Sequence, residues 1–312
     1  MGAILNVVLP VFAIVLAGYL GGRTRLLGEP SSEALNRFVY YVALPALFFA
    51  SMARVPVAAI FNWPFLAAYC SGVVATAGLA VAVARLVFPN RLAALGLHGL
   101  SATFANTGYM GIPLLVTAFG EAAALPAIIA TVLNGAVIMA IGIMIVELDL
   151  SRGGGALRIL ADVARGVARS PLVLSALAGI AVSSLGLKLP PALATFCDIL
   201  GAAAAPCALF AIGLFMVGRS ITAGAGEIAW VVALKLVVQP LVTWGLAVPL
   251  LGMDRLWAAS AVTLAALPTG TLVFVLAQQY GIYTQRATAA ILVSTVLSVV
   301  TLSALFAWLG VG

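Results

Sequence analysis

The sequence predicts an all-α polytopic membrane protein with ten transmembrane helices, arranged as two inverted five-helix repeats. Its composition is 64% hydrophobic and 8% charged, whereas a soluble domain carries roughly 25% charged residues. Apolar segments long enough to cross a bilayer recur along the chain. Two of these segments are interrupted near their middle, and the interruptions occupy matching positions in the two halves of the chain.

The predicted spans follow one another with short connections. A membrane-crossing helix needs about 20 apolar residues. Segments of this kind lie at residues 3–21, 34–52, 64–88, 93–120, 123–146, 171–187, 196–217, 227–250, 256–280 and 287–309. The chain therefore divides into a first repeat at 1–147, a short cytoplasmic linker at 148–170 and a second repeat at 171–312.

The two halves align without a gap at an offset of 161 residues. The aligned anchors are proline and glycine pairs: Pro10 with Pro171, Pro45 with Pro206, and Gly120 with Gly281. Because each half has an odd number of spans, the second half enters the membrane in the opposite orientation, and the repeat is inverted. Matched interruptions in such repeats are the best sequence indication of a transport site.

The basic residues are unevenly distributed between the two sets of alternate connections. One set holds eleven arginines: Arg23, Arg25, Arg37, Arg85, Arg91, Arg152, Arg158, Arg165, Arg169, Arg219 and Arg286. The opposite set holds Arg54, Lys188 and Arg255. Since the Lys/Arg-rich side is cytoplasmic, both termini are expected outside. The net charge of +6 then reflects membrane orientation rather than a nucleic-acid partner.

The interruptions are expected at Asn106–Pro113 and Leu267–Thr271. Backbone that leaves a helix in lipid has no water to pair with, so it persists where it lines a site or cavity. Because proline suits the first turn of a helix, new half-helices are expected near Ile112 and at Pro268. Each places a helix N-terminus, with roughly half a positive charge, at the midplane, which favours an anion. The alternative is a pair of ordinary Pro/Gly kinks.

We expect ten residues to contact the substrate: Asn106, Thr107, Gly108, Pro113, Pro268, Thr269, Gly270, Thr271, Ser51 and Asn134. Asn106 and Thr107 supply both donors and acceptors, which suits a carboxylate with a neighbouring polar group. Ser51 has an alternative, a hydrogen bond from its hydroxyl to the carbonyl one turn back. Asn134 lies midway along the fifth span and must face protein or a cavity, so its contact with substrate is left open.

Two further residues are candidates for ion coupling or for attracting the anion. An imidazole titrates near neutrality, so His98 either carries a coupling proton or is simply hydrogen-bonded at the interface. Lys235 lies roughly 12 Å into the eighth span by helical rise and either attracts the anion or extends towards the headgroups. Sodium is the other candidate ion, held by unwound carbonyls at Phe104–Asn106. No carboxylate falls at the middle of a span, which disfavours a sodium/proton antiporter.

The sequence offers little that an enzyme would need. One histidine and no mid-span carboxylate leave no acid/base pair or nucleophile relay. Cys70, Cys197 and Cys207 show no metal-ligand or redox spacing and are predicted to be small buried residues. We therefore expect neither a metal nor a cofactor.

Three segments resemble the auxin efflux carrier family: Phe104–Leu114, Leu267–Ala277 and Lys235–Pro240. The similarity covers nearly the whole chain. It implies that broken helices four and nine cross and hold the substrate. It also implies a scaffold of spans one, two, six and seven, a mobile transport domain with an elevator-type motion, and a homodimer. Family members often carry asparagine after the second-half proline, where this chain has Thr271-Leu272, so the usual side chain for a second amide contact is absent.

The resemblance implies a secondary active or facilitative transporter of small organic anions, such as malonate and auxin-like acids, with protons or sodium as the coupling ion. It places the chain in a bacterial cytoplasmic (inner) membrane as a multi-pass protein. The alternative is a sodium-coupled symporter of the bile acid/sodium symporter type, which strict sodium dependence of uptake would distinguish. An intramembrane enzyme would form product, and a pure receptor would bind without translocation.

Overall fold

The computed structural model describes residues 9–88, 91–150, 161, 165, 168–218 and 224–311. Helices account for most of these residues, which contain no β-strand beyond one isolated bridge between Ala105 and Thr269. The start of the first predicted span lies outside the described residues, as do most of the linker at 148–170 and the arginines Arg152, Arg158 and Arg219. The all-helical prediction is confirmed for the described part of the chain.

The helices of the first half are α1 Leu9–Arg23, α2 Glu29–Phe38, η2 Val39–Ala43, α3 Leu44–Arg54, α4 Val57–Ile60, α5 Trp63–Val87, α6 Leu92–Thr103, η3 Thr107–Gly111, α7 Ile112–Phe119, η4 Glu121–Ala123, α8 Ala124–Leu133, η5 Asn134–Ile138 and α9 Met139–Leu150. Those of the second half are α11 Pro171–Ser184, α12 Pro191–Met216, α13 Ala225–Ala233, η6 Leu234–Val238, α14 Gln239–Gly245, η7 Leu246–Leu250, α15 Arg255–Ala266, α16 Leu272–Tyr280 and α17 Thr284–Leu309. Several of these elements join end to end into longer helices.

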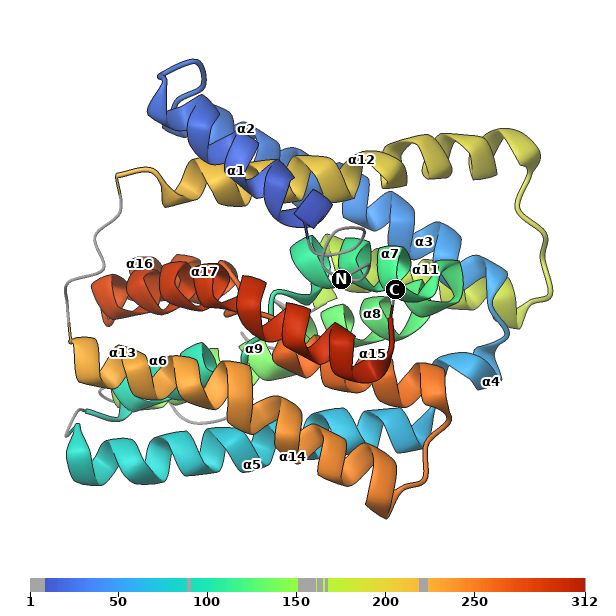
Figure 1. The fold of residues 1–312 in the computed structure, drawn as a ribbon. Helices are drawn as coiled ribbons and strands as arrows, with labels where there is room; N and C mark the ends of the chain where they lie inside the picture. Colours follow the sequence, from blue (N-terminus) through green and yellow to red (C-terminus); the bar gives the residue numbers. More distant parts are fainter. Residues whose placement is uncertain are drawn as a thin grey trace.

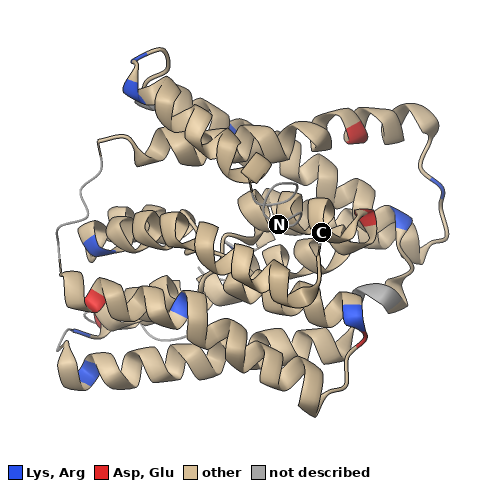
Figure 2. Cartoon of the chain, viewed as in Figure 1, with Lys and Arg blue, Asp and Glu red and all other residues tan. Residues whose placement is uncertain are grey.

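Six helices in the described part are long and apolar enough to cross a membrane: Pro30–Arg54, Trp63–Val87, Glu121–Leu150, Pro191–Met216, Ala225–Leu250 and Thr284–Leu309. Shorter apolar helices lie at Leu9–Arg23, Leu92–Thr103, Thr107–Phe119 and Pro171–Ser184. The predicted fourth and ninth spans are each divided into two pieces, and no piece is long enough to cross alone. Charged residues gather mainly at the ends of the bundle, and its middle is almost entirely uncharged (Figure 2).

Wide π-helical turns accompany several prolines inside the long helices. η2 precedes Pro45, η3 precedes Pro113 and η6 precedes Pro240. Proline lacks an N–H and its ring clashes with the carbonyl four residues earlier, and a wider turn accommodates both defects without ending the helix. The chain therefore bends at these prolines without leaving the helix.

The helices α1, α2, α3, α11 and α12 pack mainly on one another, and α1, α2 and α12 form the upper edge of the molecule in Figure 1. Two glycines let these helices approach closely. A Cβ at Gly18 would meet the backbone carbonyl of Phe210, and a Cβ at Gly179 would meet that of Phe49. Both pairs of equivalent positions are 161 residues apart, so the same contact occurs twice with the two halves exchanged.

The remaining long helices, α5, α6, α9, α13, α14, α15 and α17, form the lower part of the bundle in Figure 1. Within this part the bounds of equivalent helices are not all 161 residues apart. α6 ends at Thr103 and α15 ends at Ala266, a spacing of 163 residues, whereas Gly120 and Gly281 end the following half-helices at the original offset. The stretch from the interruption to this glycine is therefore two residues longer in the first half, where the π-turn η3 lies.

Candidate functional site

The two interrupted helices meet at their unwound segments, which pair with each other. The backbone N–H of Asn106 donates to the carbonyl of Pro268 at 2.9 Å, and that of Gly270 donates to the carbonyl of Phe104 at 2.8 Å. Ala105 and Thr269 form the antiparallel bridge between them. Each segment thus provides hydrogen-bond partners for the backbone of the other. Unwound backbone needs such partners where water is absent.

The predicted boundaries of both interruptions need correction. Backbone leaves the first helix at Phe104–Asn106 and resumes helical form at Thr107, so Pro113 lies within the new half-helix rather than at the end of a long break. The second half-helix begins at Leu272 rather than at Pro268. The reason is that Pro268 contributes its carbonyl to the pairing of the two segments, which requires extended backbone.

The paired segments 104–106 and 268–270, called the crossing below, are held together by hydrogen bonds from two polar side chains. The hydroxyl of Thr269 donates to the carbonyl of Ser101 at 2.7 Å. The carboxamide of Asn134 donates to the carbonyl of Ala105 at 3.1 Å and to the hydroxyl of Thr107 at 3.2 Å. Its oxygen accepts from the hydroxyl of Tyr69 at 3.2 Å. Both donor hydrogens of Asn134 therefore have partners within the protein.

Lys235 supplies hydrogen bonds, directly or through Gln239, to the C-terminal ends of α15 and α6. Its side chain is fully buried, so it does not extend to the headgroups. Its ammonium donates to the carbonyl of Ala265 at 2.5 Å and to Gln239 Oε1 at 2.7 Å, and Gln239 Nε2 donates to the carbonyl of Thr103 at 3.2 Å. Helix C-termini leave carbonyls unpaired and carry partial negative charge. The side chains of Lys235 and Gln239 supply the donors that these two helix ends lack.

A cavity of about 210 Å³ lies against the N-terminal ends of the other two half-helices. Gly108, Tyr109, Thr271 and Leu272 line it, and their backbone N–H groups have no acceptor within the described part of the chain. Asn106 also lines the cavity, with 6% of its surface exposed, and its carboxamide makes no hydrogen bond to any described residue. Five uncommitted amide groups therefore border one small space.

The opposite wall of this cavity is largely apolar and comes from other helices. Leu44 of α3 and Leu172 and Val173 of α11 line it, together with Tyr40 in the π-turn before Pro45. The cavity thus lies between the two groups of helices seen in Figure 1. A ligand bound there would touch both groups.

The predicted contact residues fall into three sets. Asn106, Thr107, Gly108, Asn134, Gly270 and Thr271 line the cavity. Pro268 and Thr269 lie behind it as parts of the crossing, and Ser51 and Pro113 are outside its lining. Sequence reasoning missed Tyr40, Thr131 and Gln279, which also line it. Of these, only Tyr40 had a signal in the sequence, because it precedes the Pro45 kink.

A second, larger cavity of about 1070 Å³ adjoins the first. Tyr40, Tyr109, Thr271 and Leu272 line both. Beyond them the second cavity is bordered by polar residues of α2 and α16: Ser32, Glu33, Asn36, Arg37 and Gln278. The small cavity therefore continues into a polar space between α2, α12 and α16.

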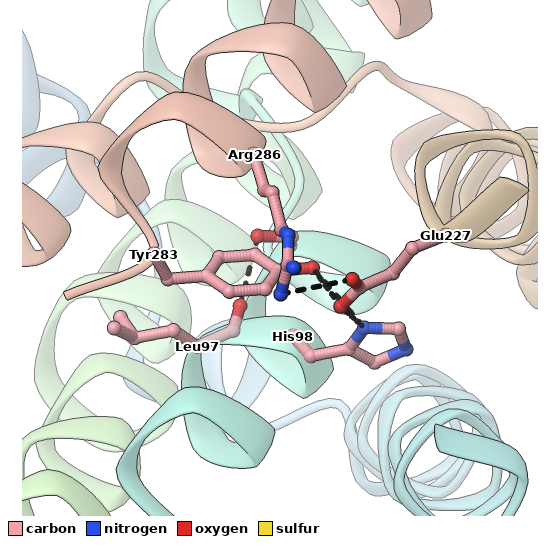
Figure 3. Close-up of polar contacts among 6 residues, drawn as sticks. Leu97, His98, Glu227, Tyr283 and Arg286 are labelled. Carbon is pink, nitrogen blue, oxygen red and sulfur yellow. Dashed lines mark hydrogen bonds and ion pairs between the residues drawn. The ribbon is translucent and has the colours of Figure 1, made fainter. Parts of the chain in front are cut away.

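His98 lines neither cavity. It is buried together with Glu227 and lies in a group with the partly exposed Tyr283 and Arg286 (Figure 3). Among the described residues, no group of three His, Cys, Asp or Glu side chains could hold a metal ion. Cys70, Cys197 and Cys207 are free thiols, and only Cys197 is fully buried.

An all-helical, apolar chain with two broken helices that pair beside a small amide-lined cavity is a membrane transport protein. The family model described as "Membrane transport protein" matches residues 3–153 and 155–306. The chain belongs to this family, and the expected membership in the auxin efflux carrier family is confirmed.

Three microbial relatives are similar to this chain over nearly their full length. A Rhizobium meliloti protein named "Putative malonate transporter" is 36% identical over 312 residues, covering 98% of this chain and 95% of the relative. An "Uncharacterized transporter" of Methanothermobacter thermautotrophicus is 28% identical over 299 residues, covering 95% of each chain. An "Uncharacterized transporter YfdV" of Escherichia coli is 26% identical over 300 residues, covering 94% of this chain and 93% of the relative.

Proposed function

We propose that this transporter carries small organic anions, with short dicarboxylates such as malonate as the first candidates, and that the 210 Å³ cavity binds them. The observation that carries the proposal is the set of uncommitted amides at Asn106, Gly108, Tyr109, Thr271 and Leu272. Backbone N–H groups at helix N-termini bind anions because the donors converge and the helix dipole is positive there. The Asn106 carboxamide adds a donor and an acceptor for a second polar group.

The size of the cavity and the name of one relative support the same class of substrate. Its volume of about 210 Å³ corresponds to roughly seven water molecules at about 30 Å³ each, which suits a substrate of a few carbon atoms. The Rhizobium meliloti relative is named for malonate. No lysine or arginine lines this cavity in the described part of the chain. The amide groups are therefore the groups that attract the anion.

A sodium-coupled symporter is less well supported by the hydrogen bonds at the crossing. The carbonyls of Phe104, Ala105 and Asn106, expected as sodium ligands, each accept a hydrogen bond from a protein donor. The ammonium of Lys235 already occupies the space beside Ala265.

The wider architecture that we propose has ten spans in two inverted repeats, with both termini outside and the protein in the bacterial inner membrane. The exchanged contacts of Gly18 and Gly179 support the repeat. Because the cavity lies between two groups of helices, we propose an elevator-type movement of the crossing past a scaffold of α1–α3, α11 and α12, in a homodimer. The larger cavity, which contains Arg37 of the arginine-rich side, is then the cytoplasmic access route.

The test is malonate binding to purified protein by isothermal titration calorimetry, followed by uptake of labelled malonate into proteoliposomes under imposed pH, sodium and voltage gradients. Asn106→Ala should weaken binding at least about tenfold, the loss of one charge-assisted hydrogen bond, and leave the thermal midpoint nearly unchanged. Thr117→Ala is the matched control, since Thr117 is exposed on the same half-helix and its hydroxyl bonds only Pro113. Wild-type affinity in Asn106→Ala would exclude this cavity as the anion site.

A further inference from the structure

A cluster of ionisable side chains around the buried His98 and Glu227 lies outside the linings of both cavities described above. Figure 3 shows the imidazole of His98, the hydroxyl of Tyr283 and the guanidinium of Arg286 converging on the carboxylate of Glu227. Glu227 comes from the first turn of α13, Arg286 from α17, and Tyr283 from the connection between α16 and α17. The cluster therefore ties α6, α13 and α17 to the end of α16.

The contacts assign the hydrogen positions. Glu227 Oε1 lies 2.9 Å from His98 Nδ1 and 2.7 Å from the hydroxyl of Tyr283, and its Oε2 lies 3.1 Å from Arg286 Nη1. A buried carboxylate needs donors around it, and Arg286 is always charged. The hydroxyl of Tyr283 also lies 3.1 Å from His98 Nδ1, but it donates its hydrogen to the closer Glu227 oxygen. Nδ1 of His98 therefore carries the hydrogen that faces the Glu227 carboxylate.

This tautomer leaves one basic position open. His98 is fully buried, and its Nε2 has no hydrogen-bond partner among the described residues. In the Nδ1–H tautomer, Nε2 carries the lone pair of the ring. Burial and the neighbouring Glu227 carboxylate raise the pKa of the Tyr283 hydroxyl, so that hydroxyl stays protonated and acts only as a donor. Nε2 of His98 is thus the position in the cluster where a proton can add.

Other charged groups near α6 are already engaged elsewhere. From α5, His98 meets the uncharged ring of Phe88 at 6.4 Å between centroids. On α9, Glu147 accepts from the hydroxyl of Tyr280 at 2.6 Å. Asp149 accepts from the backbone N–H of Ala93 in the first turn of α6 at 3.0 Å and pairs with Arg91 at 3.9 Å. The ammonium of Lys235 on η6 is bound at the crossing. The charge that faces the imidazole directly is therefore that of Glu227.

We propose that His98 is a proton-binding site, held by Glu227, and that its protonation strengthens anion binding at the crossing. The step adds one proton to Nε2 and raises the charge of the cluster by one, with no bond broken in the protein. The second half of the proposal rests on the anion-carrier function proposed above. It gives the carrier a proton as the ion whose binding is linked to that of the substrate.

The position of the cluster explains how it acts on the cavity. His98 lies five residues, or about 7.5 Å of helical rise, before α6 ends at Thr103, and the unwound segment up to Asn106 adds to this separation. A unit charge at roughly 15 Å, in an effective dielectric of about 20, changes anion affinity on the order of tenfold. Tyr283 adds a mechanical connection, because it follows α16, whose first turn lines the cavity. By linkage, anion binding must favour proton uptake by the same factor.

The chain contains a single histidine, which makes the test direct. Protein with ¹⁵N-labelled histidine, purified in nanodiscs with a tag that contains no histidine, is titrated by NMR between about pH 4.5 and pH 9. We expect the Nδ1–H tautomer at high pH and conversion to the doubly protonated ring as the pH falls. Malonate should bind on the order of tenfold more tightly to the protonated form, and calorimetry in buffers of different ionisation enthalpy should show proton uptake on binding.

Variants distinguish a role of His98 and Glu227 in proton binding from a role in stabilising the fold. His98→Gln should bind malonate at every pH with the affinity that the wild type has at high pH. Glu227→Gln removes a negative charge and so raises the charge of the cluster by one, and it should bind malonate at every pH about as tightly as the protonated wild type. Both variants should lose the pH dependence. Tyr280→Phe is the matched control, since it removes a similar tyrosine–carboxylate bond, to Glu147, and should keep the pH dependence. Should Glu227→Gln fail to fold, Tyr283→Phe removes one of the three donors to Glu227 and should shift the titration of the ring.

The proposal is overturned by an Nε2–H tautomer, by a ring signal that does not change over this pH range, or by pH-dependent malonate affinity that persists in His98→Gln. If the protein does not bind anions at all, the experiments give a different result. In that case no malonate binding is seen at any pH, while the NMR titration, which needs no substrate, still decides whether His98 takes up a proton.

Discussion

At the scale of single residues, the polar side chains of the crossing differ in what they already bind. Asn134, Thr269 and Lys235 direct their hydrogen bonds to backbone carbonyls of the two broken helices. Asn106 has no such partner in the described structure and borders the cavity. Residue type alone predicts that all four are buried for a reason, but only their partners distinguish a residue that supports the site from one that is available to a ligand.

Lys235→Met should destabilise the protein. The substitution removes the only charged donor to the carbonyl of Ala265 and leaves Gln239 Oε1 without its partner. A buried acceptor left unpaired costs roughly 1–3 kcal/mol, so the midpoint of thermal unfolding in detergent should fall by several degrees. Lys188→Met, at an exposed lysine, is the control and should melt like the wild type. An unchanged midpoint in Lys235→Met would mean that this cation does not stabilise the half-helix ends.

At the scale of elements, the interruptions and the π-turns show how proline acts in these helices. Two prolines at similar places in the sequence have different outcomes. Pro113 follows a π-turn and stays inside a helix, whereas Pro268 lies in extended backbone paired with the other segment. Proline only prevents the regular backbone hydrogen bond from residue i to the carbonyl of residue i−4. Whether a wider turn or an unwound segment replaces it depends on which partner helix is close enough to pair.

Close helix packing gives an element-scale prediction. Gly179→Ala should destabilise the contact between α11 and α3, because the added Cβ would overlap the backbone of Phe49. Overpacking of this kind costs typically about 1–3 kcal/mol, measured as a lower thermal midpoint. Gly78→Ala on α5 is the control: nothing lies within 4 Å of its added Cβ, and alanine favours the helix. Equal midpoints for the two variants would show that α11 and α3 do not approach as closely as described.

At the scale of the whole molecule, the arrangement of charges predicts the orientation in the membrane. With the arginine-rich side in the cytoplasm, a C-terminal alkaline phosphatase fusion should be active in bacterial cells and a C-terminal GFP fusion should be dark. A fusion after Leu150, the last residue of α9, should give the opposite pair of results. A fluorescent C-terminal GFP would reverse the proposed orientation and move the larger cavity to the outer side.

Apolar composition, segment length and the paired Pro/Gly interruptions were sufficient to predict a helical membrane transporter of this family and the neighbourhood of its site, because these properties are local to the chain. Asn106, Thr107 and Gly108 could be predicted as site residues for the same reason. The pairing of Asn106 with Pro268, the use of Lys235 as a donor to Ala265, and the gathering of His98, Glu227 and Tyr283 could not be predicted. They join residues more than 25 positions apart, and only the packing of distant helices brings such partners within hydrogen-bonding distance.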